Sequence, residues 1–274
     1  MARKKQKARK VFISVDMEGI CGVSRWEDVS EKGSDYAYFR SLMTEEANAA
    51  VQGAVDAGAT QIIVRDAHGH ACNLLPEKLH EKALLIRGWS GGPLLMMEGI
   101  DRSFDAAVFI GYHSAAGTAD GVLHHTITRR LAEVRLNGRA VPEITLNAAI
   151  AGQFGVPVVF ASGDRALIQQ AKELLGSREY VIVKEGIGQA ARNIHPAVAR
   201  KLIRQGVKRA LSEFQNYPPF LPEKPIRLTL QFVEVKDAAR AALFPGVQEL
   251  DSRTVELTDG DLMTVLKFFY LAVS

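Results

Sequence analysis

Carboxylate and imidazole side chains follow three short apolar segments of the sequence. Asp16 and Glu18 come directly after a β-branched segment, His68 follows a second such segment, and His113 follows a third. If these segments are neighbouring parallel strands, their carboxyl ends meet at one edge of the sheet, where ligands bind in open parallel sheets. Carboxylates and imidazoles without thiolates form a ligand set for Zn²⁺, Mn²⁺ or Fe²⁺ in a hydrolytic or oxygenase-like site.

Asp16 and Glu18 are only two residues apart. In an extended segment they share a face, and Gly19 lets the backbone turn beside them. Two neighbouring carboxylates repel each other unless a cation lies between them. Glu143 follows Pro142 in the first turn of a predicted helix, where a carboxylate could equally do no more than favour the helix dipole.

Histidines are concentrated at the same strand ends. Five of the seven fall just after a predicted strand or in the loop beyond it: His68, His70, His113, His124 and His125. A single aspartate at a strand end more often caps a helix or bonds a turn than binds a metal, and a single loop histidine is seldom a ligand. Such structural roles, taken one residue at a time, do not explain why all these side chains gather at one edge of the predicted sheet. Their convergence therefore favours a metal-dependent site.

The elements that must position these residues alternate between strands and helices. Short apolar segments predict buried strands at residues 11–15, 62–64, 84–86, 106–110 and 156–161. Apolar residues spaced three and four apart predict a long helix over residues 36–57, ended by Gly58. This alternation predicts an α/β fold, with a mostly parallel sheet and helices on both faces, plus a smaller C-terminal α+β module.

Three local signals refine this pattern. Asn137-Gly138 predicts a hairpin with a type I′ turn between residues 134–136 and 139–141. Pro142 is expected at the first position of the next helix. Asp164 is a candidate N-cap for the helix that follows the strand at 156–161.

Proline content divides the chain. Residues 216–225 contain four of the ten prolines, which favours a linker there. Before the linker we expect an α/β metal-binding catalytic domain over residues 11–215, preceded by a basic flexible tail at residues 1–10. After it, residues 226–274 predict an α+β module for packing or assembly. Its last helix carries an apolar stripe that could face a partner or belong to the core, formed by Leu262, Val265, Leu266 and Phe269.

The composition is that of an ordinary globular protein, with 47% hydrophobic and 24% charged residues among 274. No apolar run is long enough for a membrane-spanning helix, and the basic start has no apolar segment of a secretory signal behind it. Cys21 and Cys72 cannot build a disulfide framework, and we interpret them as small buried fillers. A cytoplasmic location without a membrane partner is therefore expected.

The net charge of +3 comes from the N-terminal tail. Six of the 34 Lys and Arg residues lie within residues 3–10, and the other 28 face 31 acidic residues. The tail could contact nucleic acid in a non-enzymatic assembly protein, which is one alternative function. Because no basic stripe continues into the rest of the chain, no nucleic-acid partner is expected.

Several short motifs occur together in the order found in one peptidase family. They are Ser14-Val15-Asp16-Met17-Glu18-Gly19, Met43-Thr44-Glu45-Glu46-Ala47-Asn48, Asp66-Ala67-His68, Glu98-Gly99, Gly111-Tyr112-His113, Gly121-Val122 with His125, and Glu143 with Leu146-Asn147-Ala148. In these motifs the chain resembles the DppA-type D-aminopeptidases, a family of bacterial and archaeal dinuclear zinc peptidases. The resemblance is dense over residues 11–165 and thinner beyond them.

The resemblance implies two divalent metal ions per subunit, with Zn²⁺ expected. Asp16 would bridge the two ions, and the other ligands would be Glu18, His68, His113 and Glu143. His125 matches the catalytic histidine of the family, and its neighbour His124 is a second candidate. Because neighbours on an extended segment point to opposite faces, only one of them is expected to reach the site, and we expect His125.

The resemblance also implies a reaction and an assembly. The chain would be a metal-dependent aminopeptidase that removes the N-terminal residue, a D-amino acid, from short peptides or amides. It would form a homo-oligomer, expected to be a decameric ring. The same ligand set would suit another dinuclear metallohydrolase such as a phosphoesterase, which would need a cationic or amide-rich cradle. Gly91-Gly92 and the loop at Gly117 are the available glycine segments for such a cradle.

Overall fold

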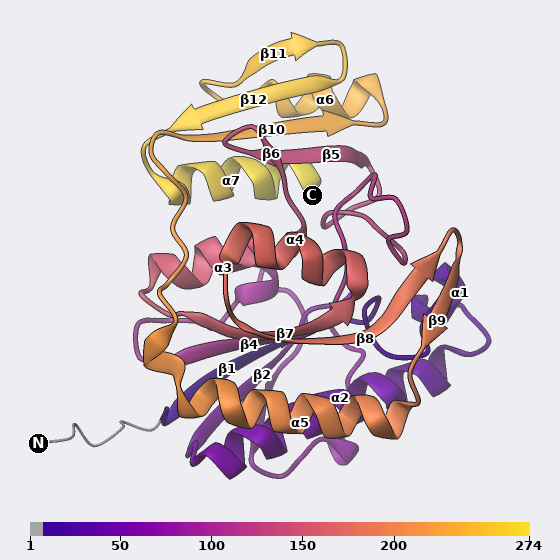
Figure 1. The fold of residues 1–274 in the computed structure, drawn as a ribbon. Coiled ribbons are helices and arrows are strands. Elements are labelled where there is room, and N and C mark those ends of the chain that lie inside the picture. Colours follow the sequence, from indigo (N-terminus) through magenta and orange to yellow (C-terminus); the bar gives the residue numbers. More distant parts are fainter. Residues whose placement is uncertain (1–7) are drawn as a thin grey trace, which may run out of the picture.

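The computed structural model describes residues 8–274 and contains two β-sheets (Figure 1). The first sheet has seven strands in the order β3–β2–β1–β4–β7–β8–β9. All its neighbours pair in parallel except β8 and β9, which are antiparallel. Its strands are β1 (Lys10–Val15), β2 (Gln61–Asp66), β3 (Ala83–Ile86), β4 (Ala106–Tyr112), β7 (Val158–Asp164), β8 (Glu179–Ile187) and β9 (Ala190–Asn193).

Helices cover both faces of this sheet (Figure 1). On one face lie α2 (Tyr36–Ala57) and α5 (Pro196–Ser212), and on the other lie α3 (Glu143–Gln153) and α4 (Arg165–Leu175). Shorter pieces are α1 (Trp26–Val29) and the 3₁₀ turns η1 (Pro76–Lys78), η2 (Leu95–Met97) and η3 (Phe214–Asn216). The predicted α/β class, with a mostly parallel sheet between helices, is confirmed.

Two of the local signals in the sequence act as expected, and a third is displaced by one residue. Gly58 ends α2 in the left-handed conformation, with φ of 96°. The Asp164 carboxylate caps α4 by accepting a hydrogen bond from the Leu167 backbone N–H at 3.0 Å. Pro142 differs by one position, since it is the N-cap of α3 and Glu143 is the first helical residue.

The second sheet has five antiparallel strands in the order β11–β12–β10–β5–β6. Its strands are β5 (Leu131–Leu136), β6 (Arg139–Ala140), β10 (Ile226–Phe232), β11 (Gln248–Asp251) and β12 (Thr254–Asp259). Asn137 and Gly138 both have positive φ, as the predicted type I′ turn requires. The β5–β6 hairpin lies within the range predicted for the catalytic domain, yet it pairs with β10, so two distant parts of the chain build this sheet.

The C-terminal helices α6 (Val235–Ala241) and α7 (Leu262–Val273) pack on the second sheet. Figure 1 shows α7 between this sheet and helices α3 and α4. The apolar stripe of α7 is buried there, and it belongs to the same core cluster as residues of α3 and β4. The stripe is therefore part of the subunit core, not an exposed face for a partner.

Most of the predicted basic tail, residues 1–7, lies outside the described residues. Within the rest, Ala8 is buried, and the backbone N–H groups of Arg9 and Lys10 donate to Asp105 Oδ2 at 2.7 and 2.9 Å. Lys10 is already part of β1, where it pairs with Gln61 of β2, and the carboxylate of Asp105 anchors the backbone that enters this strand. Among residues 8–274, no helix has both the length and the apolar character needed to cross a membrane.

The strand order brings three loops together, because β1 lies between β2 and β4. The chain after β1 is tied to β4 by backbone hydrogen bonds from Asp16 to Ile110 at 2.8 Å and from Gly19 to Gly111 at 2.7 Å. A Cβ atom on Gly19 would lie 1.9 Å from the carbonyl oxygen of Tyr112. Gly19 is therefore required for this close approach of two backbones.

A buried lysine on β8 holds the same loop from the other side. Lys184 Nζ donates to the carbonyl oxygens of Glu18, Ile20 and Val23, the last two at 3.0 and 2.7 Å. Burial lowers the pKa of Lys184 to about 8, against the attraction of Asp164. The lysine thus satisfies three buried backbone acceptors in the segment that carries Glu18.

Replacing Lys184 with Met should destabilise the fold by about 3 kcal/mol, because the three carbonyl groups lose their donor while staying buried. Urea unfolding of the metal-free protein would measure this change. Lys201→Met, at an exposed position of α5, is the matched control and should change stability by less than about 0.5 kcal/mol. An equally small effect of Lys184→Met would mean that the loop does not depend on this lysine.

Candidate active site

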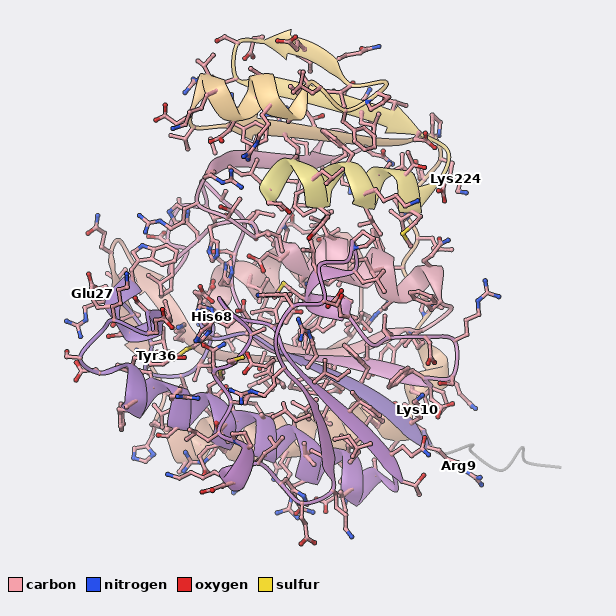
Figure 2. All side chains as sticks on the ribbon, turned by 180° about the vertical axis from the view of Figure 1, so that it is seen from behind. Arg9, Lys10, Glu27, Tyr36, His68 and Lys224 are labelled. Carbon is pink, nitrogen blue, oxygen red and sulfur yellow. The ribbon has the colours of Figure 1, made fainter. Side chains whose placement is uncertain are left out.

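Five buried side chains meet at the carboxyl edge of the parallel sheet. Asp16 and Glu18 lie in the loop after β1, His68 follows β2, His113 follows β4, and Glu143 opens α3. Each is less than one-tenth exposed. Figure 2 shows His68 among the interior side chains at this end of the molecule. The structure therefore brings together all five residues that the sequence predicted as metal ligands.

Glu18 and His68 form a first group with one oxygen of Asp16. His68 Nδ1 lies 2.9 Å from Glu18 Oε2 and 3.4 Å from Asp16 Oδ1. His68 Nε2 donates to the carbonyl oxygen of Val29 at 2.8 Å, which directs Nδ1 at the two carboxylates. One ligand atom from each of the three side chains lies within 4.8 Å of the others, close enough to hold one metal ion.

His113 and Glu143 form a second group with the other oxygen of Asp16. His113 Nε2 lies 3.0 Å from Glu143 Oε1 and 3.4 Å from Asp16 Oδ2. His113 Nδ1 donates to the carbonyl oxygen of Ser114 at 3.1 Å, so Nε2 faces the carboxylates. Asp16 thus presents one carboxylate oxygen to each group, which is the arrangement of a bridging ligand.

The electrostatics of the cluster fit a bound cation. Asp16 Oδ2 and His113 Nε2 are buried and have no hydrogen-bond partner among residues 8–274. Burial, together with repulsion by Glu18, raises the pKa of Asp16 to about 8. For His113, burial is outweighed by the attraction of Glu143, which raises its pKa to about 10. Divalent metals would compensate the crowded carboxylates, and carboxylate and imidazole donors are ligands that suit Zn²⁺.

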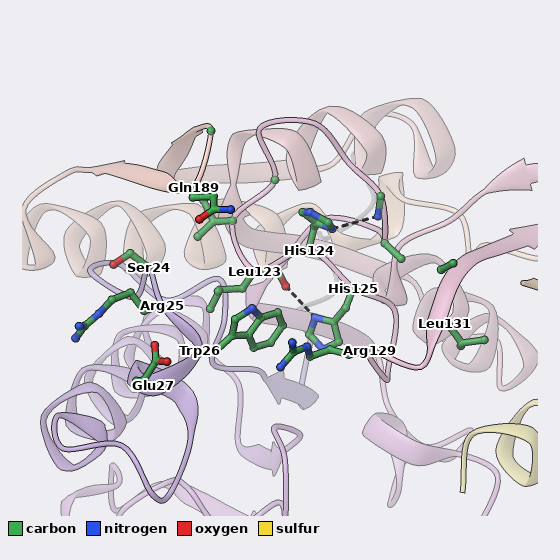
Figure 3. A pocket seen from close by; sticks show the side chains of 16 residues that line it. Ser24, Arg25, Trp26, Glu27, Leu123, His124, His125, Arg129, Leu131 and Gln189 are labelled. Atoms are coloured by element: carbon green, nitrogen blue, oxygen red, sulfur yellow. Dashed lines mark hydrogen bonds between the residues drawn. The ribbon is translucent and has the colours of Figure 1, made fainter. Parts of the chain in front are cut away.

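His125 lies beside both groups. Its Nε2 is 3.8 Å from Glu18 Oε1 and 3.7 Å from Glu143 Oε1, and its ring stacks on His113 with centroids 4.1 Å apart. Its Nδ1 donates to the carbonyl oxygen of Leu123 at 2.9 Å, so Nε2 is the atom that faces the site (Figure 3). Burial and the charge of His113 lower the pKa of His125, which favours the neutral ring.

His124 is oriented differently from its neighbour. It is exposed, and its Nδ1 accepts a hydrogen bond from the Gly117 backbone N–H at 3.1 Å (Figure 3). The two rings therefore point in different directions, as expected for neighbours on an extended segment. His125 also lies close enough to Glu18 and His113 to form a third set of metal-ligand atoms, so its geometry alone is compatible with either role.

The cluster opens into a cavity of about 420 Å³. Besides the site residues, its walls include Trp89, Met96 and Tyr270. Val273 and Ser274 also line it, so the end of α7 supplies one wall. The C-terminal part of the chain, for which the sequence indicated no chemistry, thus shapes the space beside the predicted metal ligands.

Other polar residues of the strand ends have structural contacts. The carboxylate of Asp66 accepts hydrogen bonds from the backbone of Asn73 and Leu74, both at 2.6 Å, and stabilises the loop after β2. His70 lies at the surface, 3.2 Å from Glu31. For Asp66 and His70 the structure therefore agrees with the alternative interpretation, in which a strand-end carboxylate or a loop histidine supports local structure.

The cysteines lie outside the clusters of possible metal ligands that residues 8–274 contain. Cys21 is buried, and its thiol donates to the carbonyl oxygen of Ile194 at 2.9 Å. Cys72 is half-buried, and its carbonyl oxygen accepts a hydrogen bond from Arg40. The interpretation of the cysteines as small buried side chains that fill space therefore fits Cys21 better than Cys72.

Three residues near the site were not found from the sequence. Lys184 holds the loop of Glu18, Trp26 packs against His125, and Arg129 lies over the Trp26 ring. A tryptophan in the polar segment 24–28 was the available signal for Trp26, since a large aromatic residue there needs a packing partner. For Lys184 and Arg129 the sequence contains no comparable signal.

Comparison with known proteins gives one consistent family. The sequence model of the D-aminopeptidase family matches residues 9–271. A D-aminopeptidase of Bacillus subtilis (strain 168) is 35% identical over 257 residues, which cover 93% of each chain. The solved structure of the Zn-dependent D-aminopeptidase DppA from Bacillus subtilis, described as a self-compartmentalizing protease, is 33% identical. It superposes with a TM-score of 0.91 over 96% of each chain. This chain, whose strand ends bring the five carboxylate and imidazole residues together, belongs to the D-aminopeptidase family.

Proposed function

We propose that this protein is a metal-dependent D-aminopeptidase that uses two Zn²⁺ ions to hydrolyse the N-terminal residue of short peptides or amides. One observation carries the proposal above all others: the two oxygens of Asp16 face two separate groups of buried ligand atoms. The preference for an N-terminal D-residue and for zinc is supported by the family and by the zinc dependence of its solved relative.

In this proposal Asp16 would help to hold both ions. Glu18 and His68 complete one group, and His113 and Glu143 complete the other. When bound, such an ion pair lowers the pKa of a coordinated water and polarises the scissile carbonyl group. The protein contributes the geometry, since backbone carbonyl groups of Val29 and Ser114 fix the two imidazole rings.

His125 is proposed as the catalytic residue that handles the proton. Its Nδ1 is engaged with Leu123, so Nε2 can accept a proton from the attacking water and pass it to the leaving amine. Because Nε2 lies beside both ligand groups, it would come close to a substrate carbonyl group held there. The free amine of the substrate would be bound by a metal or a neighbouring carboxylate, which explains why only an N-terminal residue is removed.

Neither alternative function is favoured. A phosphoesterase needs cationic groups around a phosphate that would lie at the predicted metal ligands. Among the described residues, the lining of the 420 Å³ cavity at those ligands includes Gly91 and Gly92 but no Lys or Arg. The nucleic-acid interpretation depends on the basic tail, most of which lies outside residues 8–274.

A cytoplasmic location stays a prediction, in keeping with two free cysteines.

Purified protein should hydrolyse a D-alanyl amide at least about tenfold more efficiently than the L-alanyl amide, in the range that pocket shape provides. A chelator should abolish both activities, and Zn²⁺ should restore them. Hydrolysis of p-nitrophenyl phosphate without hydrolysis of either amide would instead support the phosphoesterase alternative. Equal turnover of both amides would contradict the proposed chirality.

The number of metal ions bound per subunit distinguishes a residue that binds both ions from a residue that binds only one. Wild-type protein should carry two ions per subunit, Asp16→Ala should carry none because a bridge serves both ions, and His68→Ala should keep one. Elemental analysis after gel filtration measures the ratio, and circular dichroism confirms that each variant is folded. Two ions in Asp16→Ala would exclude the bridging role.

Replacing His125 with Ala should lower kcat by about 10²–10⁴-fold, the range for one positioned acid–base group, while two metals stay bound. The matched control is His124→Ala, which should lose much less activity because this ring is exposed and faces Gly117. A larger loss from His124→Ala would reverse the assignment of the two histidines. Loss of metal from His125→Ala would identify His125 as a ligand.

We also propose that the subunits form a closed homo-oligomeric ring, expected to be a decamer. The proposal is supported by the self-compartmentalizing relative, which matches 96% of the chain. Light scattering at micromolar concentration should then give ten times the 30.0 kDa mass of one subunit. A mass of one subunit would contradict any ring, and a different multiple would contradict the decamer only.

A further inference from the structure

A second cavity adjoins the active site, and His125 lines both. It has a volume of about 590 Å³ and is bordered by Trp26 and Arg129, among other residues (Figure 3). His125 also borders the first cavity, together with the predicted metal ligands. A substrate whose scissile bond lies at His125 can therefore have one part in each cavity.

Aromatic contacts define the wall of this second cavity. The Trp26 ring packs edge-on against the His125 ring, with centroids 5.3 Å apart. The guanidinium carbon of Arg129 lies 4.5 Å from the centroid of the Trp26 ring. Figure 3 shows the three side chains gathered together. The positive charge of Arg129 thus lies on the Trp26 ring, which itself contacts the proposed catalytic histidine.

This charge is available to a ligand. Among residues 8–274, no carboxylate lies within ion-pair distance of Arg129. The other arginine of the cavity, Arg25, differs in this respect, because it contacts Asp28 at 3.0 Å and Asp35 at 3.3 Å. Figure 3 also shows Arg25 directed away from His125. Arg129 is therefore the cation of this cavity that can meet an anionic substrate.

We propose that the second cavity binds the part of the peptide that follows the scissile bond, and that Arg129 binds the C-terminal carboxylate of a short peptide. This inference rests on the proposed function, which places the N-terminal residue at the metal ligands. The two ring contacts, 5.3 Å from His125 to Trp26 and 4.5 Å from Trp26 to Arg129, place the Arg129 guanidinium within about 10 Å of the His125 ring. An extended chain advances about 3.5 Å per residue, so one to three residues after the scissile bond reach Arg129. The substrates favoured by this arrangement are short peptides, from di- to tetrapeptides, with a free carboxylate.

The test compares D-Ala-D-Ala with D-Ala-D-Ala amide, which lacks the terminal charge. For wild-type protein, kcat/KM should favour the free acid by about tenfold, as expected for a charge-assisted hydrogen bond at a partly exposed site. In Arg129→Gln this ratio should fall to about 1, with the change mainly in KM. Arg129→Lys should keep an intermediate ratio, because it retains the charge without the planar fork.

Two controls make the result specific. Arg25→Gln should keep the wild-type ratio, because Arg25 is already paired with Asp28 and Asp35. Raising NaCl to 0.5 M should reduce the ratio in wild type but not in Arg129→Gln, since salt screens an exposed charge pair. Calorimetric titration of the metal-free protein with D-Ala-D-Ala gives a readout without turnover, and binding should weaken in Arg129→Gln.

The outcomes distinguish a failure of the carboxylate subsite from a failure of the proposed aminopeptidase function. If the metal-loaded wild type hydrolyses both substrates with equal efficiency, or if Arg129→Gln keeps the tenfold ratio, the carboxylate subsite is wrong and the aminopeptidase function stands. If wild type hydrolyses neither substrate, the proposed function fails and the subsite fails with it.

Discussion

Three carboxylates, those of Asp16, Glu18 and Glu143, are buried together at one edge of the parallel sheet. Each would lose much of its solvation energy on its own, so the cluster depends on the positive charges that it faces. His68 and His113 supply part of this charge, and backbone carbonyl groups fix the orientation of both rings. The loops, the close backbone approach at Gly19 and the buried Lys184 all serve to hold like charges where they would otherwise separate.

The parallel sheet and the convergence of its strand-end carboxylates and imidazoles could be predicted from the sequence because their signals are local. Strand β1 is a mostly apolar segment, and the C-terminal end of α2 and the start of α4 are marked by Gly58 and Asp164. Asp16, Glu18, His68 and His113 each follow such a segment within three residues, so their convergence needs only the strand order. The individual ligand roles, including that of Glu143 and the bridging position of Asp16, came from the family resemblance, not from spacing, and they stay predictions.

Features that depend on distant pairing could not be predicted. Strand β5 pairs with β10, in the register Leu228 with Leu136, and no local pattern specifies this partner. The end of α7 becomes a cavity wall only through the packing of the second sheet. Lys184 is one of three charged residues of β8, and its role depends on three carbonyl groups more than 160 positions earlier in the chain.

The second sheet has a consequence for the order in which the molecule is completed. The proposed metal ligands lie within the first 143 residues, whereas β10 and α7, which finish the sheet and the cavity wall, come from the last 49. A chain made from its N-terminus exposes the β5–β6 hairpin until strand β10 has been synthesised, because contacts between such distant segments form late. The groups proposed to cleave peptides are therefore made before the wall that limits access to them, and a prematurely ended chain would lack that wall.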